Sequence, residues 1–584
     1  MQGDDLTRRS RRQAAWALAL IAGAAVALRV LGLGFGLPHV YNQDEVSIMA
    51  RALGFARGDL NPHNFLYPTF YFYVLFGWLG AFFLAGRAIG LFSSLAAFQT
   101  QFFVDPTAIY LAGRALSVAS GVACVWIVFR AGRRLAGLTA GLAGAMFLAV
   151  APFAVRDAHY VKHDVPATLA VLVAWYACAR LESAAPGRPR LWSVLAAGAA
   201  SGVAFSTHYY TIFLVLPLAA AIVMSSRDRR AALRELGAAG LASALVFVAL
   251  SPFLLVEFRT AMADVAANRG IVVDRAVAGR LGPFASAGAY ARMMVSDAMG
   301  WPVFLLALAG VPILWLRDRR QAVLLLLFPV SFLAFVSNTV PATRYLNPVL
   351  PFAAIFAGVS VAAVARAAGR LRTVAALAIG LAAAAPGCQQ SLNAGWFFRQ
   401  EDTRTLALRY IDANVQPGAG IAVQPYSVPL TQSRESLLEA LRVNLGDPGK
   451  ASPKFALRLR LDPYPEPAYR TTFIGDGGLD ADKIYVGYRE LGGPQGLAAL
   501  RKRGVSWVVL KRYAEPGRET VPFLTALAAE GRLVASFSPY REKWSHGGNN
   551  LPAPYLHNMD SRITRELERP GPIVEVWQLS GVLK

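Results

Sequence analysis

Two adjacent carboxylates, Asp44 and Glu45, follow the first long apolar segment of the chain. A carboxylate near a bilayer surface can act as a general base, because burial raises its pKa while nearby Arg or Lys lowers it. Asp44 also precedes apolar residues at helical spacing, so it can cap a helix and interact with the helix dipole. The two roles are compatible, because a cap fixes the side chain in place. Asp44 and Glu45 are therefore candidate catalytic acids.

A second polar cluster, "RDAHYVKHDVP" at residues 156–166, comes directly before another apolar segment. Cations in this cluster can hold a phosphate, which makes His159 and Lys162 candidate phosphate ligands. Asp164 can orient a donor molecule or share the work of the base. The structural alternative is a solvated loop in which Asp164 caps the helix that follows.

Four further residues supply cations or a hydroxyl group. Arg344 and Tyr345, in the segment "VPATRYLNP", lie at the mouth of a later apolar segment, and His208 lies in a tight turn between two others. Arg29 lies inside the first apolar segment, where an arginine is costly unless it is paired or reaches water. We expect Asp44, Glu45 or Asp164 to pair with Arg29, and a structural ion pair is as good an interpretation as ligand contact.

The same residues predict no definite metal site. The two histidines of the second cluster are four residues apart, as some zinc ligands are, but the proline that follows them disfavours a regular helix. A hard divalent cation held by Asp44, Glu45 and Asp164 remains open.

The elements that must position these residues are membrane helices. The chain is 55% hydrophobic and 16% charged, whereas about a quarter of the residues of a soluble protein are charged. Apolar runs long enough to cross a bilayer recur from residue 14 to about residue 385. After Cys388, charged residues, Pro and Gly become frequent. We predict a transmembrane domain at residues 1–387 and a soluble domain at residues 388–584.

Basic residues in the short loops predict the topology. They form six clusters, and all six can be cytoplasmic only if an even number of spans separates each from the next. The first interval holds three apolar stretches, and we interpret 67–90, with its early Pro68 and aromatic start, as an interfacial helix. A true span there is the alternative. The prediction is a polytopic α-helical membrane protein with about 11 transmembrane helices, a cytoplasmic N-terminus and an extracytoplasmic C-terminal domain. All three polar clusters then face the outer side.

Residues 388–584 alternate helical and strand patterns, which predicts a small α/β domain. Its predicted helices are 403–415 and 433–445, and its predicted strands are 483–491, 506–513, 532–540 and 572–579. Tyr426, Asp476 and Trp544 are candidates for contact with an acceptor, with a scaffold role as the alternative.

Composition and patterning also bear on the class of function. The net charge of +22 does not indicate nucleic-acid binding, because much of the surplus is Arg in short loops between apolar spans. A transporter or flippase for lipid-linked sugars is the main alternative to an enzyme. It predicts polar residues near helix midpoints and related halves of the chain, whereas the polar clusters here lie at one face.

The order of these motifs resembles the C-type glycosyltransferase superfamily. "LRVLGLGFGLPHVYNQDEVSIMARAL" has an Arg late in the first span, a Pro and then an Asp-Glu pair, as the first-loop signature of that superfamily does. More narrowly, the chain is similar to the bacterial relatives of the protein O-mannosyltransferases and the lipid A aminoarabinose transferase. Later motifs agree with this resemblance in "NFLYPTFYFYVLF", "YLAGRALSVASG", "RDAHYVKHDVPATLAVLVAW", "ATRYLNPVLPFAAIFAG" and "DTRTLALRYIDANVQPGAGIAV".

The resemblance implies a transferase that moves a sugar from a polyprenyl-phosphate carrier to a hydroxyl acceptor, usually with inversion, outside the cytoplasmic (inner) membrane of a bacterium. Asp44 would be the leading catalytic carboxylate, with Glu45 and Asp164 in support. The carrier phosphate or its ion-pair network would fall to Arg29, Lys162 and Arg344. The chain departs from the family pattern at Leu66 and His208, where relatives often have a cation. The sugar and the acceptor (protein, glycolipid or cell-wall glycan) stay open.

Overall fold

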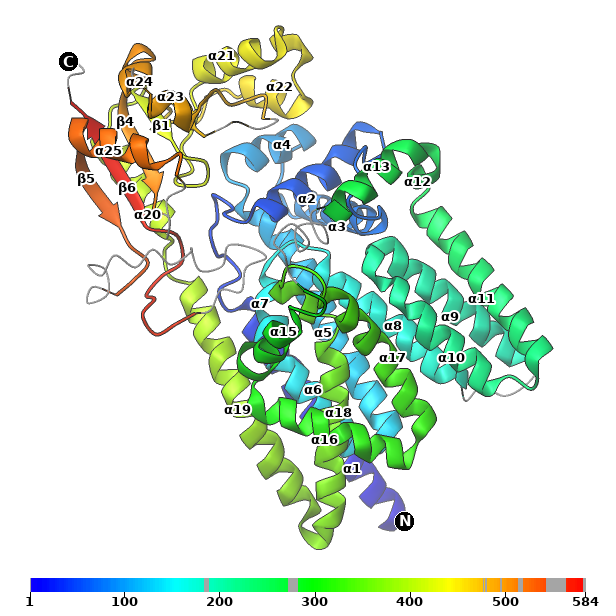
Figure 1. Cartoon of the computed structure of the whole chain (residues 1–584). Coiled ribbons are helices and arrows are strands. Elements are labelled where there is room, and N and C mark those ends of the chain that lie inside the picture. Colours follow the sequence, from blue (N-terminus) through cyan, green and yellow to red (C-terminus); the bar gives the residue numbers. More distant parts are fainter. Residues whose placement is uncertain are drawn as a thin grey trace.

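The computed structural model of the chain describes residues 2–182, 188–270, 282–475, 477, 480–493, 496–512, 518–541 and 563–580. It has two parts: a large helical bundle formed by the first two thirds of the chain, and a domain with a β-sheet formed by the last third (Figure 1). The N-terminus lies at the end of the bundle away from the sheet domain.

Long helices form the body of the bundle. They are α1 (Gln2–Val30), α3 (Phe70–Ala88), α5 (Thr107–Ala136), α8 (Asp164–Glu182), α9 (Arg188–Thr207), α11 (Arg229–Leu250), α16 (Trp301–Arg317), α17 (Arg319–Val336), α18 (Leu350–Ala367) and α19 (Arg372–Phe398). Within the described part of the chain, 8 helices are long and apolar enough to cross a membrane, or up to 10 if each bent pair of helices is one span. The prediction of a polytopic helical membrane protein is confirmed. The number of crossings remains a prediction, as does the interfacial position of α3, which meets the same length and composition test.

Shorter helices fill the connections. They are α2 (Gln43–Gly54), α4 (Leu95–Val104), α6 (Leu138–Ala149), α7 (Pro152–Arg156), α10 (Val215–Ser225), α12 (Phe253–Val256), α13 (Phe258–Arg269) and α15 (Ala287–Met293), with short turns η1 (Phe55–Arg57), η2 (Asp157–His159), η3 (Tyr209–Leu214), η5 (Met294–Ala298), η6 (Thr343–Leu346) and η7 (Gly369–Leu371). In Figure 1, α2, α3, α4 and α13 lie at the end of the bundle nearer to the sheet domain.

The apolar segment that leads into the second polar cluster forms a bent pair of helices. Helix α6 ends at Ala149, and α7 with η2 continues at 59° to it. Pro152 stands at the start of α7, where its missing N–H and fixed φ suit a first helical turn but prevent continuation of α6. The bend places the second polar cluster at the end of the bundle rather than along a straight helix.

Close packing of small residues holds the centre of the bundle. A Cβ added at Gly358 on α18 would lie 2.3 Å from the Ala140 carbonyl oxygen of α6, and one at Gly310 on α16 would lie 2.1 Å from the carbonyl oxygen of Phe356. Glycine therefore lets three helix backbones approach closely, as small residues do in membrane bundles. Helix α18, which follows the third polar cluster, is accordingly the candidate span with the largest buried share in the described chain, 78%.

The C-terminal domain is built on a six-stranded sheet of order β3-β2-β1-β4-β6-β5. Its strands are β1 (Gly420–Val423), β2 (Arg470–Ile474), β3 (Tyr485–Val486), β4 (Val505–Lys511), β5 (Gly531–Phe537) and β6 (Val574–Leu579). Strands β1 to β4 pair in parallel, and β6 pairs antiparallel with both β4 and β5. The helices are α20 (Thr403–Asn414), α21 (Arg434–Leu445), α22 (Pro453–Leu459), α23 (Tyr488–Leu491), α24 (Ala498–Lys502) and α25 (Val521–Glu530), with the turn η8 (Pro448–Lys450).

The predicted α/β domain is confirmed, with one local difference. The helices predicted at 403–415 and 433–445 and the strands predicted at 506–513, 532–540 and 572–579 are present as α20, α21, β4, β5 and β6. The segment 483–491 forms only the two residues of β3, because Gly487 then caps the short helix α23. The proposed domain boundary at residues 387 and 388 lies inside α19, which continues to Phe398.

Candidate active site

Asp44 lies in the first turn of α2, at the end of the bundle nearer to the sheet domain. The N-cap of this helix is Asn42, whose side chain accepts a hydrogen bond from the Asp44 N–H at 3.0 Å. The alternative in which Asp44 caps the helix is therefore wrong, because Asn42 is the N-cap and Asp44 is already the second residue of α2. The Asp44 carboxylate instead faces two cations, and 30% of its side chain is exposed.

Those cations come from the other two polar clusters. The Lys162 Nζ lies 3.0 Å from Asp44 Oδ2, and the Arg344 Nη1 lies 3.7 Å from the same oxygen. Lys162 is also near the ring of Tyr160, and Arg344 is near the ring of Tyr345, at 5.5 and 5.3 Å. Three segments that are more than a hundred residues apart in the sequence thus meet at one carboxylate. This contact agrees with the prediction that the three polar clusters lie on the same side of the membrane.

The Glu45 carboxylate is buried and accepts hydrogen bonds on both of its oxygens. Its carboxylate accepts two hydrogen bonds from the Arg114 guanidinium at 2.9 and 2.8 Å, and both side chains have no exposed surface. The N–H of Val161 donates to the same carboxylate at 2.8 Å. Arg114 also donates to the carbonyl oxygens of Leu33 and Phe35. The Glu45 carboxylate therefore links α2, α5, the loop after α1 and the second cluster, and the catalytic role predicted for Glu45 stays a prediction.

The second and third clusters are held together by a buried polar network. Arg156 pairs with Asp157 at 3.0 Å and donates to the Thr343 hydroxyl at 2.7 Å. The Asn347 amide donates to the other oxygen of Asp157 at 2.5 Å. This network fixes η6, which carries Arg344, against the loop that carries Lys162. Sequence analysis did not identify Thr343 and Asn347, because nothing in the local sequence indicates that either residue contacts a partner about 190 residues away.

Aromatic and imidazole rings form a wall beside these cations. The ring of Tyr67 lies 3.9 Å from that of His163 and 5.3 Å from that of His208. Burial lowers the pKa of His163 to about 4, despite the nearby charge of Asp164. Burial, together with His163 and Arg344, lowers the pKa of His208 well below its usual value. Both imidazoles are therefore neutral at pH 7, so His208 can donate a hydrogen bond to a ligand but brings no charge.

Asp164 and Tyr345 complete the predicted set near the centre. Asp164 is the first residue of α8 and is 4% exposed. Its negative charge favours the protonated forms of Tyr67, His163 and Arg344, so the Asp164 carboxylate lies near these three groups.

Arg29 and His159 lie elsewhere than predicted. The Arg29 guanidinium donates to the carbonyl oxygens of Ala149 and Leu148 at 2.9 and 3.3 Å. These carbonyls belong to the last two residues of α6, where the regular hydrogen bonding of the helix ends at the bend. The expectation of a carboxylate partner for Arg29 is therefore wrong. The ring nitrogens of His159 lie 2.9 and 2.8 Å from the carbonyl oxygens of Val155 and Leu31, so this buried ring joins backbone segments instead of facing Asp44.

The candidate divalent-cation ligands do not gather into one site. Both oxygens of Glu45 are occupied by Arg114, and Lys162 lies against Asp44. Within the described ranges, no group of three or more His, Cys, Asp or Glu residues is arranged to hold a metal ion. In the soluble domain, Tyr426 is half exposed with its ring 5.5 Å from the Lys511 Nζ, while Asp476 and Trp544 lie outside the described residues.

Part of the chain is similar to a known family, and its fold is similar to that of solved structures. Residues 91–255 match the family model described as dolichyl-phosphate-mannose-protein mannosyltransferase. This range contains Arg114, Lys162 and Asp164 but neither Asp44 nor Arg344. The search of curated proteins found no match.

Two solved structures share the fold over nearly the whole chain. The oligosaccharyltransferase AglB from Archaeoglobus fulgidus, in complex with an inhibitory peptide and a dolichol-phosphate, has a TM-score of 0.53 at 10% identity, covering 98% of this chain and 89% of that one. ArnT from Cupriavidus metallidurans, bound to undecaprenyl phosphate, has a TM-score of 0.50 at 16% identity, covering 88% of this chain and 96% of that one. At these identities the likeness establishes the fold.

Proposed function

The chain resembles the C-type, polyprenyl-phosphate-sugar-dependent glycosyltransferases in family signature and in fold, and on that premise we propose that it moves a sugar from a polyprenyl-phosphate donor to a hydroxyl acceptor. The observation that carries the proposal is the meeting of Lys162 and Arg344 at the one partly exposed carboxylate of the site, Asp44. A transferase of this kind needs a base for the acceptor and cations for the leaving phosphate.

The reaction follows from these three side chains. Asp44 takes the proton of the acceptor hydroxyl as its oxygen attacks the anomeric carbon. The bond between that carbon and the phosphate oxygen breaks, and its electron pair leaves with the polyprenyl phosphate. Lys162 and Arg344 neutralise the charge that develops on this phosphate. Attack from the face opposite to the phosphate inverts the anomeric carbon.

The donor-free geometry also implies a change on donor binding. Lys162 and Arg344 both neutralise Asp44 in the structure. A donor phosphate offers more oxygens to the same cations and competes for them. When the cations turn toward the phosphate, Asp44 loses a stabilising charge and becomes a better proton acceptor. The donor thereby prepares the base for the acceptor.

The site is proposed to face the outside of a bacterial cytoplasmic membrane. The basic N-terminal segment and the sheet domain lie at opposite ends of the bundle, and the Asp44 centre lies at the end nearer to the sheet domain. With basic segments retained in the cytoplasm, this arrangement puts the N-terminus inside and both the site and the sheet domain outside. Membrane lipid, the lipid-linked donor and the acceptor would then meet in the outer leaflet.

The test is a transfer assay with purified protein, several radiolabelled polyprenyl-phosphate sugars and membrane extract. We expect label to move from the lipid carrier to a new product, and Asp44→Asn to lower that rate by about 10²–10⁴-fold, the usual contribution of a general base. Asp59→Asn, an exposed carboxylate of the same outer loop, is the matched control and should retain the rate. Normal turnover by Asp44→Asn contradicts the assignment, and unchanged donor carried across vesicles without a new product supports a flippase instead.

A further inference from the structure

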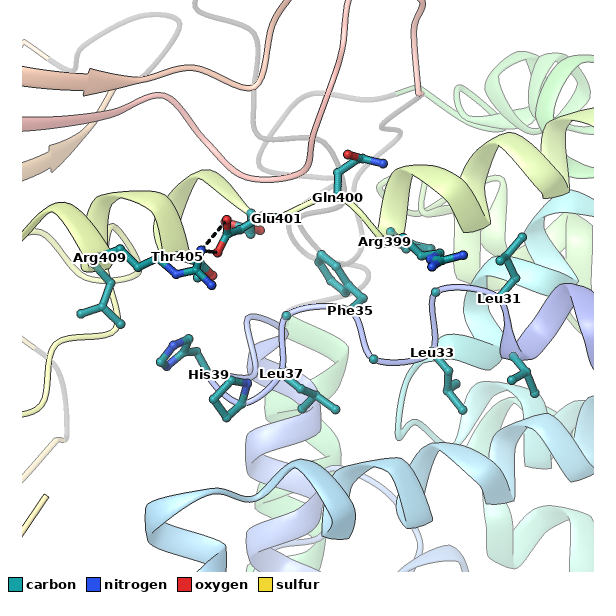
Figure 2. Close-up of a pocket in the computed structure, with 18 of the residues that line it drawn as sticks. Leu31, Leu33, Phe35, Leu37, His39, Arg399, Gln400, Glu401, Thr405 and Arg409 are labelled. Atoms are coloured by element: carbon teal, nitrogen blue, oxygen red, sulfur yellow. Dashed lines mark hydrogen bonds and ion pairs between the residues drawn. The ribbon is translucent and has the colours of Figure 1, made fainter. Parts of the chain in front are cut away.

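A large groove opens beside the first outer loop, away from the Asp44 carboxylate (Figure 2). Its volume is about 1220 Å³, and it is walled on one side by the outer end of α1 with residues 31–39, and on the other by residues 398–412. We call it the lateral groove. The Arg114 side chain holds the carbonyl oxygens of Leu33 and Phe35 from behind, so the loop backbone stands between the lateral groove and the Glu45 network.

The floor of the lateral groove is formed by exposed apolar residues of α1, a candidate membrane span. Val26 and Val30 line it, and they are 43% and 48% exposed on a helix whose apolar window is only 17% buried. A second apolar groove of about 660 Å³ lies between α1 and α5, and Val26, Val30 and Leu33 line both grooves. These three apolar side chains therefore form a ridge between the two grooves, which suits a lipid with two hydrocarbon chains better than one with a single chain.

The rim of the lateral groove offers one cation to such a lipid. Arg399, at the end of α19, lines the groove, and Figure 2 shows its side chain beside Leu31. Its guanidinium lies 4.8 Å from the ring of Trp396, which is 53% exposed, as tryptophans at a membrane interface are. No carboxylate of the described ranges lies within ion-pair distance of Arg399, whereas Arg409 is already paired with Glu401 at 2.9 Å.

We propose that the lateral groove binds a diacyl phospholipid of the outer leaflet, with its phosphate against Arg399 and its two chains on either side of the Val26–Val30–Leu33 ridge. An arginine recognises phosphate oxygens through charge-assisted hydrogen bonds. The buried apolar area supplies the remaining affinity. Because residues 31–39 continue into α2, the bound lipid steadies the loop that carries the catalytic carboxylate.

The experiment measures lipid adducts by native mass spectrometry of the full-length, delipidated protein. Dioleoylphosphatidylglycerol should bind as a discrete adduct, and dioleoylglycerol, which lacks the phosphate, should bind at least about tenfold more weakly. Arg399→Gln should weaken phosphatidylglycerol to a similar degree. Arg460→Gln, an exposed arginine of the sheet domain, is the matched control and should leave binding unchanged.

A second variant tests the groove rather than the cation. Gly34 lines the lateral groove, and a Cβ added there meets nothing within 4 Å, so Gly34→Trp fills the groove without a clash and should remove the adduct. Equal phosphatidylglycerol affinity in the wild type, Arg399→Gln and Gly34→Trp overturns the proposal. So does undecaprenyl phosphate, a single-chain lipid, if it displaces phosphatidylglycerol from the wild type and its own adduct is lost in Gly34→Trp.

Discussion

Replacing Glu45 by glutamine removes one charge from a pair that has no access to water. The Arg114 guanidinium stays in the same fully buried position, with two backbone carbonyls and a neutral amide oxygen as acceptors but no countercharge. Breaking a buried pair by removing one member costs about 3–5 kcal/mol, because the other charge is left uncompensated. The Val161 N–H loses a charged acceptor in addition. We therefore expect Glu45→Gln to lower the free energy of unfolding by about 3 kcal/mol or more.

The neighbouring substitution Asp44→Asn should behave differently. The Asp44 side chain is 30% exposed, and the side chain of Lys162 reaches it from the open side of the site. Partly exposed ion pairs are worth about 1 kcal/mol or less. We thus expect loss of the Asp44 charge to lower mainly the transfer rate, and loss of the Glu45 charge to lower mainly the stability of the fold.

The measurement is a urea titration of each purified variant in one detergent, with the folded fraction read by pulse proteolysis, alongside the transfer assay. Asp44→Asn should keep nearly the wild-type midpoint and lose transfer. Glu45→Gln should shift the midpoint strongly, and a second substitution, Arg114→Met, should recover part of the loss by removing the unpaired charge. A Glu45→Gln protein that unfolds at the wild-type midpoint yet fails in transfer would show that Glu45 acts on the substrate.

Two further predictions concern charge at the donor site and in the sheet domain. Lys162→Met should raise the KM for the polyprenyl-phosphate donor by about 10–100-fold in the transfer assay, since a charge-assisted contact is worth about 1.5–3 kcal/mol; an unchanged KM would place the donor phosphate elsewhere. Burial, with Arg404 nearby, lowers the pKa of Lys511 to about 8, so the folded state carries the full penalty of a buried charge below pH 8 and loses it as the pH rises toward 10.5. Lys511→Met should therefore raise the melting temperature at pH 7 and lose that advantage by pH 10.5, and a gain independent of pH would refute this cause.

The sequence could predict on which side of the membrane the residues of the site lie. Basic loops and apolar runs are local patterns, and together they predicted that three distant clusters face one side. The contacts of Asp44 with Lys162 and Arg344 agree with that prediction. The helix assignments of the bundle and most of the sheet domain follow from the same local periodicities.

Partner choice inside the site could not be predicted in the same way. Asn42 and Asp44 are both good helix caps, and only the chain path decides that Asn42 takes the role. Arg29 finds carbonyls rather than an acid because α6 ends at a bend that apolar patterning does not reveal. The Asp157–Asn347 contact depends on packing between helices, since neither residue lies in a periodic pattern.

The sheet domain and the end of α19 contact the loop that precedes Asp44, the proposed base. The Tyr41 hydroxyl is hydrogen-bonded with Thr405 at 2.7 Å, and the Arg404 guanidinium lies 3.8 Å from the Tyr41 ring. Phe35 packs against Phe398 with ring centroids 4.8 Å apart. Tyr41 stands three residues before Asp44, so a shift of α20 moves the start of α2 directly. Through these contacts the sheet domain is placed to affect the position of Asp44, the proposed base, without contributing a catalytic residue of its own.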